Sequence, residues 1–432
     1  MKTIKTLPND DNTNGWSNIL PPRTPRPSLD GDTRADWMII GGGYSGLAAA
    51  RRLAEIRPDD RIVVLEAQRA DHGASGRNSG FMVDLPSTVA KANLGNSHGA
   101  MGLYRTAMAS LDNVVQTHGI DCQWSRRGQY QAAVSADGEV ALEAFTKRMD
   151  NLGEPYTVLG HEETRRALGT EYYRSSVHTA GTVLVQPAAL ARGLADTLPK
   201  SVDLYEDTPV THIDYAGPIR AQTPLGSVTA PKVILAVNGF APAFGFYRRQ
   251  LFTLSMFASM TRALTDTELD ALGDEKEWGI LPANVRSGAS IRLTQDRRIM
   301  YRQYATLGTA PDGHETALRH QEPLFRARFP MLPEVTFEHT WVGNVCLSRN
   351  YAPGFGQRAP NVFSAVCHCG VGLTRGTISG MLAADMAAGQ DNPLIADMEE
   401  LGRPSYLPPR PFVDLGARAS LAWYIWNGRK ER

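Results

Sequence analysis

The fold of this chain is decided by residues 36–66, DWMIIGGGYSGLAAARRLAEIRPDDRIVVLE. The first apolar run predicts a buried strand. The glycine-rich turn after it leads into a stretch whose apolar residues recur at helical spacing. A second apolar run, RIVVLE, then predicts another strand. Strand, turn, helix and strand in this order predict a βαβ unit that begins a parallel sheet.

The turn of this unit has the spacing of a dinucleotide-binding site. Gly41, Gly43 and Gly46 form the pattern G-x-G-x-x-G between the strand and the helix. The first glycine permits a tight turn, the second lets backbone approach a pyrophosphate, and the third lets helix and strand pack closely. The positive end of the helix adds electrostatic attraction for phosphate. We therefore predict that these glycines, with Tyr44 and Ser45 between them, bind a pyrophosphate.

Glu66 completes the pattern at the end of the second strand, about twenty residues after Gly46. An acidic side chain at this place accepts hydrogen bonds from the hydroxyls of an adenosine ribose. It also disfavours a 2′-phosphate. The unit therefore predicts FAD or NAD rather than NADP, and it does not choose between them because both contain the same ADP half.

Composition excludes several classes of protein. The 45 Lys and Arg residues balance the 45 Asp and Glu residues, so no overall field attracts nucleic acid, and we expect no nucleic-acid partner. The 432 residues suffice for two or three domains with buried cores. Neither a secretory signal nor a long apolar run stands out, so we expect a cytoplasmic protein without membrane association.

Four cysteines are too few for a disulfide scaffold, and we expect buried free thiols. Cys367 and Cys369 lack the spacing and the second ligand pair of a zinc site, so we expect no metal.

Three further segments carry a resemblance to a known family. They are GASGRNSG at 73–80, VILAVNG at 233–239 and CHCGVGLT at 367–374. With the dinucleotide pattern, they make residues 36–390 resemble the D-amino-acid oxidase superfamily of FAD enzymes. The most similar branch is that of glycine oxidase, monomeric sarcosine oxidase and γ-glutamylputrescine oxidase. This resemblance implies FAD as the cofactor.

The resemblance also implies further cofactor-binding residues. In this branch the segment after the second strand wraps the flavin, and the loop before the C-terminal helix turns its N–H groups toward the pyrimidine end of the flavin ring. Carried over to this sequence, the implied residues are Ala74, Ser75, Gly76, Arg77, Asn78, Ser79, Val210, Asn238, Gly370, Gly372, Leu373 and Thr374. Arg77 and Asn78 are expected to supply hydrogen-bond donors.

The implied reaction is oxidation of a C–N bond. A hydride passes from the carbon next to an amine to the flavin, and the resulting imine hydrolyses. Candidate substrate-facing residues are Arg292, Tyr301, Arg302, Tyr304, Asn344, Arg349 and His368. We favour Arg302, which can bind a carboxylate with two hydrogen bonds, and His368 beside the flavin loop, with Tyr301 as a third catalytic candidate.

Two features depart from the sarcosine oxidase pattern. Cys346 is offset from the cysteine that attaches FAD in those relatives, so we expect non-covalent FAD. Those relatives also use a lysine in the reaction with oxygen, whereas no lysine occurs from residue 277 to residue 429. O2 is the acceptor we favour, with H2O2 as its product. A quinone or a protein acceptor is the alternative.

The predicted fold is mixed α/β and α+β. A Rossmann-like FAD-binding domain takes residues 36–98, 176–242 and 345–400. An interleaved substrate domain on a mainly antiparallel sheet takes residues 99–175 and 243–344. Residues 1–35, rich in Pro, Asn and Asp, form an extended leader on or beside the fold. Residues 401–432 form a helical tail that docks on the protein itself or on a second subunit.

The function we favour is an FAD-dependent oxidase of a secondary amine or a γ-glutamylated amine. A flavin dehydrogenase of the same substrates is the second interpretation. An NAD-dependent dehydrogenase or a non-catalytic flavoprotein would belong to other classes.

Overall fold

The structure is a computed structural model that describes residues 1–86, 97–284, 288–308, 313–409 and 411–431. One half is built on a six-stranded sheet, whose order is β10-β4-β3-β14-β21-β20. Neighbouring strands are parallel except β20, which is antiparallel to β21. The strands are β3 (Trp37–Ile40), β4 (Ile62–Leu65), β10 (Val202–Tyr205), β14 (Lys232–Leu235), β20 (Gly354–Ala359) and β21 (Val362–Val366). The predicted βαβ unit and parallel sheet are confirmed.

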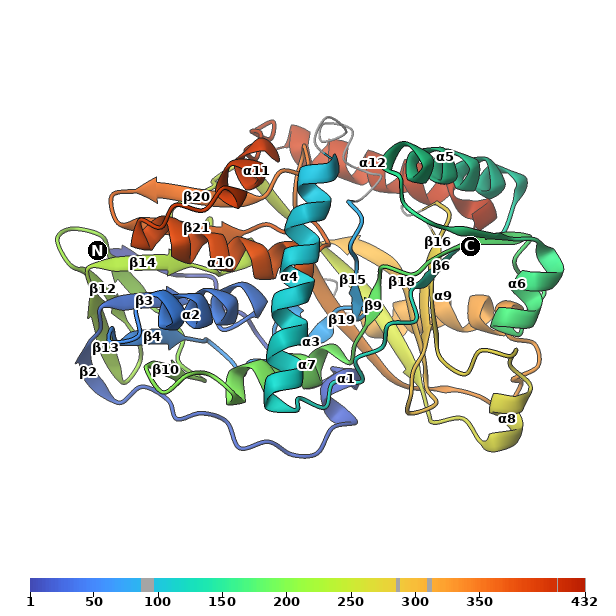
Figure 1. Cartoon of the computed structure of the whole chain (residues 1–432), viewed down its shortest axis with the longest axis horizontal. Coiled ribbons are helices and arrows are strands. Elements are labelled where there is room, and N and C mark those ends of the chain that lie inside the picture. Colours follow the sequence, from blue (N-terminus) through green and yellow to red (C-terminus); the bar gives the residue numbers. More distant parts are fainter. Residues whose placement is uncertain (87–96, 285–287, 309–312, 410, 432) are drawn as a thin grey trace.

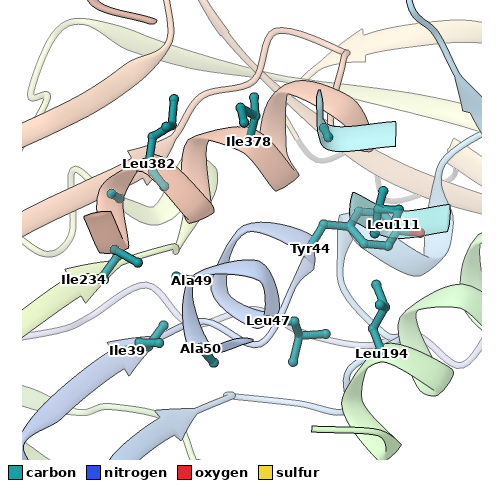
Figure 2. Packing of buried hydrophobic residues seen from close by; sticks show 14 of the residues in the cluster. Ile39, Tyr44, Leu47, Ala49, Ala50, Leu111, Leu194, Ile234, Ile378 and Leu382 are labelled. Carbon is teal, nitrogen blue, oxygen red and sulfur yellow. The ribbon is translucent and has the colours of Figure 1, made fainter. Parts of the chain in front are cut away.

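Helices pack on one face of this sheet (Figure 1). They are α2 (Tyr44–Ile56), α4 (Ser97–His118), α7 (Pro187–Asp196), α10 (Thr374–Ala388) and α11 (Leu394–Glu400). Figure 2 shows Leu47 of α2 pointing toward Leu194 of α7 and Ala50 of α2 near Ile39 of β3. Ile378 and Leu382 of α10 lie on the opposite side of α2. The strands are apolar on both faces because helices cover one face and a smaller sheet covers the other.

The smaller sheet has the order β1-β11-β12-β13-β2. Its strands are β1 (Lys2–Thr3), β2 (Gly31–Arg34), β11 (His212–Asp214), β12 (Ile219–Gln222) and β13 (Gly226–Ala230). The leader contributes both edge strands, and it forms the short helix α1 (Gly15–Asn18) between them. It lies on the fold as expected, but two of its segments pair with the smaller sheet as strands and do not only extend beside it.

The other half of the molecule is built on an eight-stranded sheet in the order β19-β15-β18-β17-β16-β6-β8-β7. Its strands are β6 (Gln129–Ala133), β7 (Thr157–Leu159), β8 (Ser175–Thr179), β15 (Leu251–Thr261), β16 (Trp278–Pro282), β17 (Ser290–Leu293), β18 (Ile299–Leu307) and β19 (Phe337–Ser348). Pairing is antiparallel except between β16 and β6. This confirms the mainly antiparallel sheet.

The two faces of the eight-stranded sheet have different neighbours. One face packs on α9 (Gly313–Arg328) through Phe325 and Tyr301. The other face turns Met300 and Trp341 toward Trp16 of α1. Further elements complete this half and the junction: α3 (Ala74–Arg77), α5 (Ala136–Leu152), α6 (His161–Leu168), α8 (Asp266–Asp270), β5 (Phe81–Met82) and β9 (Val183–Leu184).

Two details differ from the predicted domain boundaries. Helix α4 packs into the core of the six-stranded half, although residues 99–175 were assigned to the substrate domain. Strand β8 joins the eight-stranded sheet, although residues from 176 were assigned to the FAD-binding domain.

The tail contains the predicted helix, α12 (Phe412–Asn427), followed by the short helix η3 (Arg429–Glu431). Phe412, Leu415, Trp423 and Trp426 of α12 are exposed. Docking of this helix on a second subunit stays a prediction. Among the described residues, no helix combines the length and the apolar character needed to cross a bilayer.

Candidate active site

The glycine-rich turn has the backbone geometry that its pattern predicts. Gly41 follows β3 with a φ of +107°, a conformation that favours glycine. A Cβ on Gly46 would lie 1.8 Å from the backbone oxygen of Gly41, so the first turn of α2 packs directly on the loop. Gly43 is the N-cap of α2 and has extended backbone. The positive end of α2 is thereby held at this turn.

Glu66 lies at the same turn, at the end of β4. Its Oε2 atom accepts a 2.6 Å hydrogen bond from the N–H of Gly42, and its Oε1 atom accepts one of 2.9 Å from the N–H of Gln68. Burial raises the pKa of this carboxyl above its usual value. The N–H of Thr208 donates to the backbone oxygen of Glu66, which brings the segment containing the buried Val210 alongside.

Helix α3 and the turn after it lie against the start of α2. The Oγ atom of Ser75 accepts a 3.1 Å hydrogen bond from the N–H of Tyr44. Asn78 folds back on this segment: its Nδ2 atom donates to the backbone oxygen of Ser75 at 2.6 Å, and its Oδ1 atom accepts from the N–H of Gly80 at 2.8 Å. The predicted flavin-wrapping residues from Ala74 to Ser79 therefore form one ordered turn beside the glycine-rich loop.

Arg77 requires a correction. Its guanidinium group turns away from the glycine-rich loop and forms ion pairs with Asp10 and Asp11 of the leader. It also donates to the backbone oxygens of His72 at 2.8 Å and Val342 at 3.0 Å. These partners occupy the guanidinium group, so the side chain of Arg77 anchors the leader and is not free to donate to the cofactor as predicted.

The loop before α10 meets both α2 and the end of β14. The Nε2 atom of His368 lies 2.8 Å from Oγ of Ser45 in the first turn of α2. The Oδ1 atom of Asn238, in the short helix η2 (Asn238–Phe240), accepts a 3.0 Å hydrogen bond from the N–H of Cys367. The loop holds Cys367 and Cys369 at φ values of +58° and +52°. Three distant segments therefore define one site.

Polar atoms in this site lack protein partners. Oγ1 of Thr374, the first residue of α10, and Nδ1 of His368 are buried without a hydrogen-bond partner among the described residues. A Cβ on Gly372 would meet nothing within 4 Å. These atoms and this space fit a ligand rich in oxygen and nitrogen acceptors, such as the phosphates, ribityl chain and ring of FAD.

Burial determines which groups around this loop are charged. Burial and the nearby Arg375 lower the pKa of His368 to about 3, so its imidazole is neutral at neutral pH. Arg375 is itself buried and pairs with the hydroxyl of Tyr104 at 2.9 and 2.6 Å. No carboxylate of the described part of the chain forms an ion pair with Arg375. The loop therefore has a positive potential, which favours an electron-rich or anionic partner.

The cysteines behave as expected. All four are free and buried. Hydrogen bonds between neighbouring thiols, together with burial, raise the pKa of Cys367 and Cys369, so these thiols stay protonated.

The structure separates two of the catalytic candidates. Tyr301 and Arg302 are adjacent in β18, so their side chains point to opposite faces of the sheet. Tyr301 is fully buried against α9, where its hydroxyl accepts a 2.5 Å hydrogen bond from Nη1 of Arg328. The expected catalytic role of Tyr301 is therefore wrong, because its hydroxyl lies on the far side of the sheet from the glycine-rich loop.

Arg302 lies on the face of the sheet that is turned toward the other half. It pairs in the ladder with Ala258, which clusters with Met300 and Trp341 on that face. Its Nη2 atom donates a 2.6 Å hydrogen bond to Oγ of Ser290, and its Nε atom has no partner among the described residues. Burial lowers the pKa of Arg302 to about 10, which still leaves the group charged at neutral pH.

The other substrate-facing candidates have different surroundings. Arg292 is fully buried and donates to the backbone oxygens of Gly80 and Val185. Tyr304 stacks on His320 of α9, so it lies on the far face with Tyr301. The remaining candidates, Asn344 and Arg349, are exposed. The position of His368 also differs from the one expected for a substrate-facing residue. Its contact with Ser45 places it beside the first turn of α2, on the cofactor side, and not on the eight-stranded sheet.

Residues 36–386 match the protein family described as FAD dependent oxidoreductase. The chain belongs to this family.

A relative with 28% identity over 404 residues is the gamma-glutamylputrescine oxidoreductase of Escherichia coli, and the match covers 90% of each chain. The fold is similar to that of glycine oxidase from Geobacillus kaustophilus, with a TM-score of 0.71 and 20% identity over 83% of this chain and 96% of that one. Iminodiacetate oxidase from Chelativorans sp. BNC1 gives a TM-score of 0.69 at 18% identity, over 83% and 96%.

As a member of this family, the enzyme uses FAD, and the alternative of an NAD-dependent dehydrogenase is excluded. The residues present fit this cofactor. The glycine-rich turn and Glu66 would hold the ADP half, whereas Thr374, His368 and the other residues of the loop before α10 would face the flavin half.

Sequence reasoning missed several contributors to the site of this FAD-dependent oxidoreductase. Arg375 and Tyr104 were not singled out; the available signal was an arginine directly after the loop at 367–374, at the start of the expected helix. The leader residues Asn14 and Trp16, which donate to the backbone oxygens of Gly76 and Asn78, were also missed because no local pattern connects residues so far apart in the chain. The hydrogen-bond partners of these leader residues become apparent only in the folded structure.

Proposed function

We propose that this enzyme oxidises the C–N bond of a carboxylate-bearing amine, with a secondary amine or a γ-glutamylated amine as the preferred class. Membership of the FAD dependent oxidoreductase family supports a flavin redox reaction. The name of the Escherichia coli relative, gamma-glutamylputrescine oxidoreductase, supports an amine that also carries a carboxylate.

The observation that carries the substrate class is the guanidinium group of Arg302. It is partly buried on the sheet face turned toward the cofactor-binding half, and no described carboxylate pairs with it. Leaving a partly buried cation without a counter-charge is costly, and an arginine fork fits a carboxylate with two hydrogen bonds. A substrate carboxylate would supply the missing counter-charge and would orient the amine.

When bound, FAD accepts a hydride, and with it two electrons, from the carbon next to the substrate nitrogen. The substrate also loses one proton and becomes an imine. Water then adds to the imine and releases an amine or ammonia and a carbonyl compound. Arg302 would hold the substrate in place, while Arg375 and the positive end of α10 would stabilise the negative charge that arrives with the electrons.

For the electron acceptor we propose O2, which would leave as H2O2. A dehydrogenase that passes electrons to a quinone or a protein is the second candidate. The absence of lysine from residue 277 to residue 429 favours this second candidate, because a buried ammonium group is one means of promoting the reaction with oxygen. Arg302 and Arg375 are the cations that could replace it.

An absorbance experiment under anaerobic conditions tests the proposal. The purified protein is mixed with N-alkylated amino acids, γ-glutamylated diamines and amines that lack a carboxylate. We expect the visible flavin absorbance to bleach with the carboxylate-bearing amines and to return, with H2O2, when air is admitted. Return only with an artificial electron acceptor would identify a dehydrogenase. No bleaching by any amine would favour a non-catalytic flavoprotein and overturn the proposal.

A further inference from the structure

Helix α3 and the turn after it are held by side chains that come from outside them. Four consecutive or nearly consecutive backbone oxygens each accept a hydrogen bond from a different distant side chain. Gly76 accepts from Nδ2 of Asn14 at 3.0 Å, Arg77 from Nε1 of Trp341 at 3.1 Å, Asn78 from Nε1 of Trp16 at 2.9 Å and Gly80 from Nη1 of Arg292 at 3.3 Å. Trp341 and Arg292 belong to the eight-stranded sheet, whereas Asn14 and Trp16 belong to the leader.

The leader residues are themselves firmly placed. Asn14 is 3% exposed and Trp16 is 0% exposed. The backbone oxygen of Trp16 accepts a 2.8 Å hydrogen bond from the buried Gln186, and its ring meets that of Trp341 edge to face with centroids 6.2 Å apart. The leader therefore reaches into the junction between the two halves rather than lying on the surface.

The leader holds this turn at the side chain of Arg77 as well as at the backbone. Asp10 and Asp11 form ion pairs with the guanidinium group of Arg77. In the chain, Arg77 lies between Gly76 and Asn78, whose backbone oxygens accept from Asn14 and Trp16. Residues 10–16 therefore fix three consecutive residues, 76–78, through both backbone and side chain.

The held turn lies directly beside the cofactor-binding loop. Ser75 receives a hydrogen bond from the N–H of Tyr44 in the first turn of α2, and a Cβ on Gly43 would lie 2.7 Å from Oγ of Ser75. A shift of residues 76–78 would therefore move Ser75 against the glycine-rich turn.

We propose that Asn14 and Trp16 of the leader are positioning residues for FAD. They would act through the backbone of Gly76 and Asn78, to which their side chains donate, and not through contact with the cofactor. They keep the turn at residues 75–78 in its binding conformation before FAD arrives. Without them, FAD would have to order this turn as it binds, and its affinity would fall by the free energy of that ordering.

The substitution Asn14→Asp tests the proposal with little change in shape. Aspartate keeps the oxygen that caps α1 but loses the Nδ2 donor to Gly76, and it places a carboxylate against that backbone oxygen. We expect the dissociation constant of FAD, measured by recovery of flavin fluorescence on release, to rise about tenfold. Asn18→Asp is the matched control, because the exposed side chain of Asn18 donates to the backbone oxygen of Asn12 within the leader. An unchanged dissociation constant for Asn14→Asp would overturn the proposal.

A second variant separates positioning from general stability. Trp16→Phe removes the Nε1 donor to Asn78, and Trp37→Phe removes a comparable 2.8 Å bond to Asp60 far from the turn. The thermal midpoint is measured with and without FAD. We expect Trp16→Phe to reduce the rise in thermal midpoint that FAD produces. Trp37→Phe should leave this rise unchanged. If Trp16→Phe lowers both midpoints equally, Trp16 is only structural and the proposal fails.

Discussion

The Nε2 atom of His368 lies 2.8 Å from Oγ of Ser45, although the two residues are 323 positions apart in the chain. This contact joins the loop before α10 to the first turn of α2. The imidazole is neutral because burial and Arg375 disfavour its charged form. The contact therefore links the two ends of the cofactor site without adding a charge to it.

The buried imidazole makes stability depend on pH. The pKa of His368 is about 3 in the folded protein, whereas a histidine in the unfolded chain has a pKa near 6.5. The unfolded state therefore binds the proton first as the pH falls. The contribution of the neutral His368 to the free energy of unfolding is complete above about pH 6.5. It decreases as the pH falls toward 3, by up to about 1.4 kcal/mol per pH unit.

We expect the substitution His368→Asn to reduce the loss of thermal stability between pH 7 and about pH 4.5. His118→Asn, which removes an exposed imidazole at the end of α4, serves as the control. Equal pH dependence in the wild type and His368→Asn would show that His368 is not buried in its neutral form.

Gly46 has no room for a side chain. The substitution Gly46→Ala would place a Cβ 1.8 Å from the backbone oxygen of Gly41, and backbone cannot move aside as a flexible side chain can. We expect loss of FAD binding and strong destabilisation. Gly102→Ala on the exposed side of α4 meets nothing within 4 Å and should stabilise the helix by about 0.5–1 kcal/mol. Wild-type FAD affinity in Gly46→Ala would contradict the close packing.

The substitution Tyr301→Phe distinguishes a structural residue from a catalytic one. It removes the hydroxyl that accepts from the buried Arg328, so we expect a loss of about 1.5–3 kcal/mol in the free energy of unfolding. Because Tyr301 faces α9, kcat/KM for any amine substrate should stay at the wild-type value. A large fall in kcat/KM without a loss of stability would show that Tyr301 acts in catalysis and would contradict its structural role.

We predict that FAD is not covalently attached. Cys346 is buried at the end of β19, where its nearest neighbours include Cys367. Denaturation of the purified enzyme with acid should release all flavin into the supernatant, and Cys346→Ser should do the same. Flavin that stays with the precipitated wild-type protein but not with Cys346→Ser would identify Cys346 as a point of attachment.

Local sequence patterns predicted the parts of the site that depend on local geometry. The spacing of Gly41, Gly43 and Gly46 with Glu66 was sufficient to place the βαβ unit and its turn, because each contact joins neighbouring elements.

Contacts between distant segments could not be predicted in this way. The alternation of β18 shows that Tyr301 and Arg302 face opposite sides, but it does not tell which side faces the cofactor. That depends on where α9 packs. Arg77 was assigned to FAD because its motif allows it, and only the folded leader brings Asp10 and Asp11 to its guanidinium group.

The most direct test of the account is the anaerobic reduction of bound FAD by a carboxylate-bearing secondary amine and by its methyl ester. In the wild type, and in the control Arg297→Gln at the exposed turn of the same hairpin, we expect the free acid to reduce FAD at a far lower concentration than the ester. In Arg302→Gln, the concentration of acid needed for half-maximal reduction should rise at least about tenfold, while that of the ester stays unchanged. Equal behaviour of Arg302→Gln and the wild type with the acid would contradict the assignment of Arg302 to the substrate carboxylate.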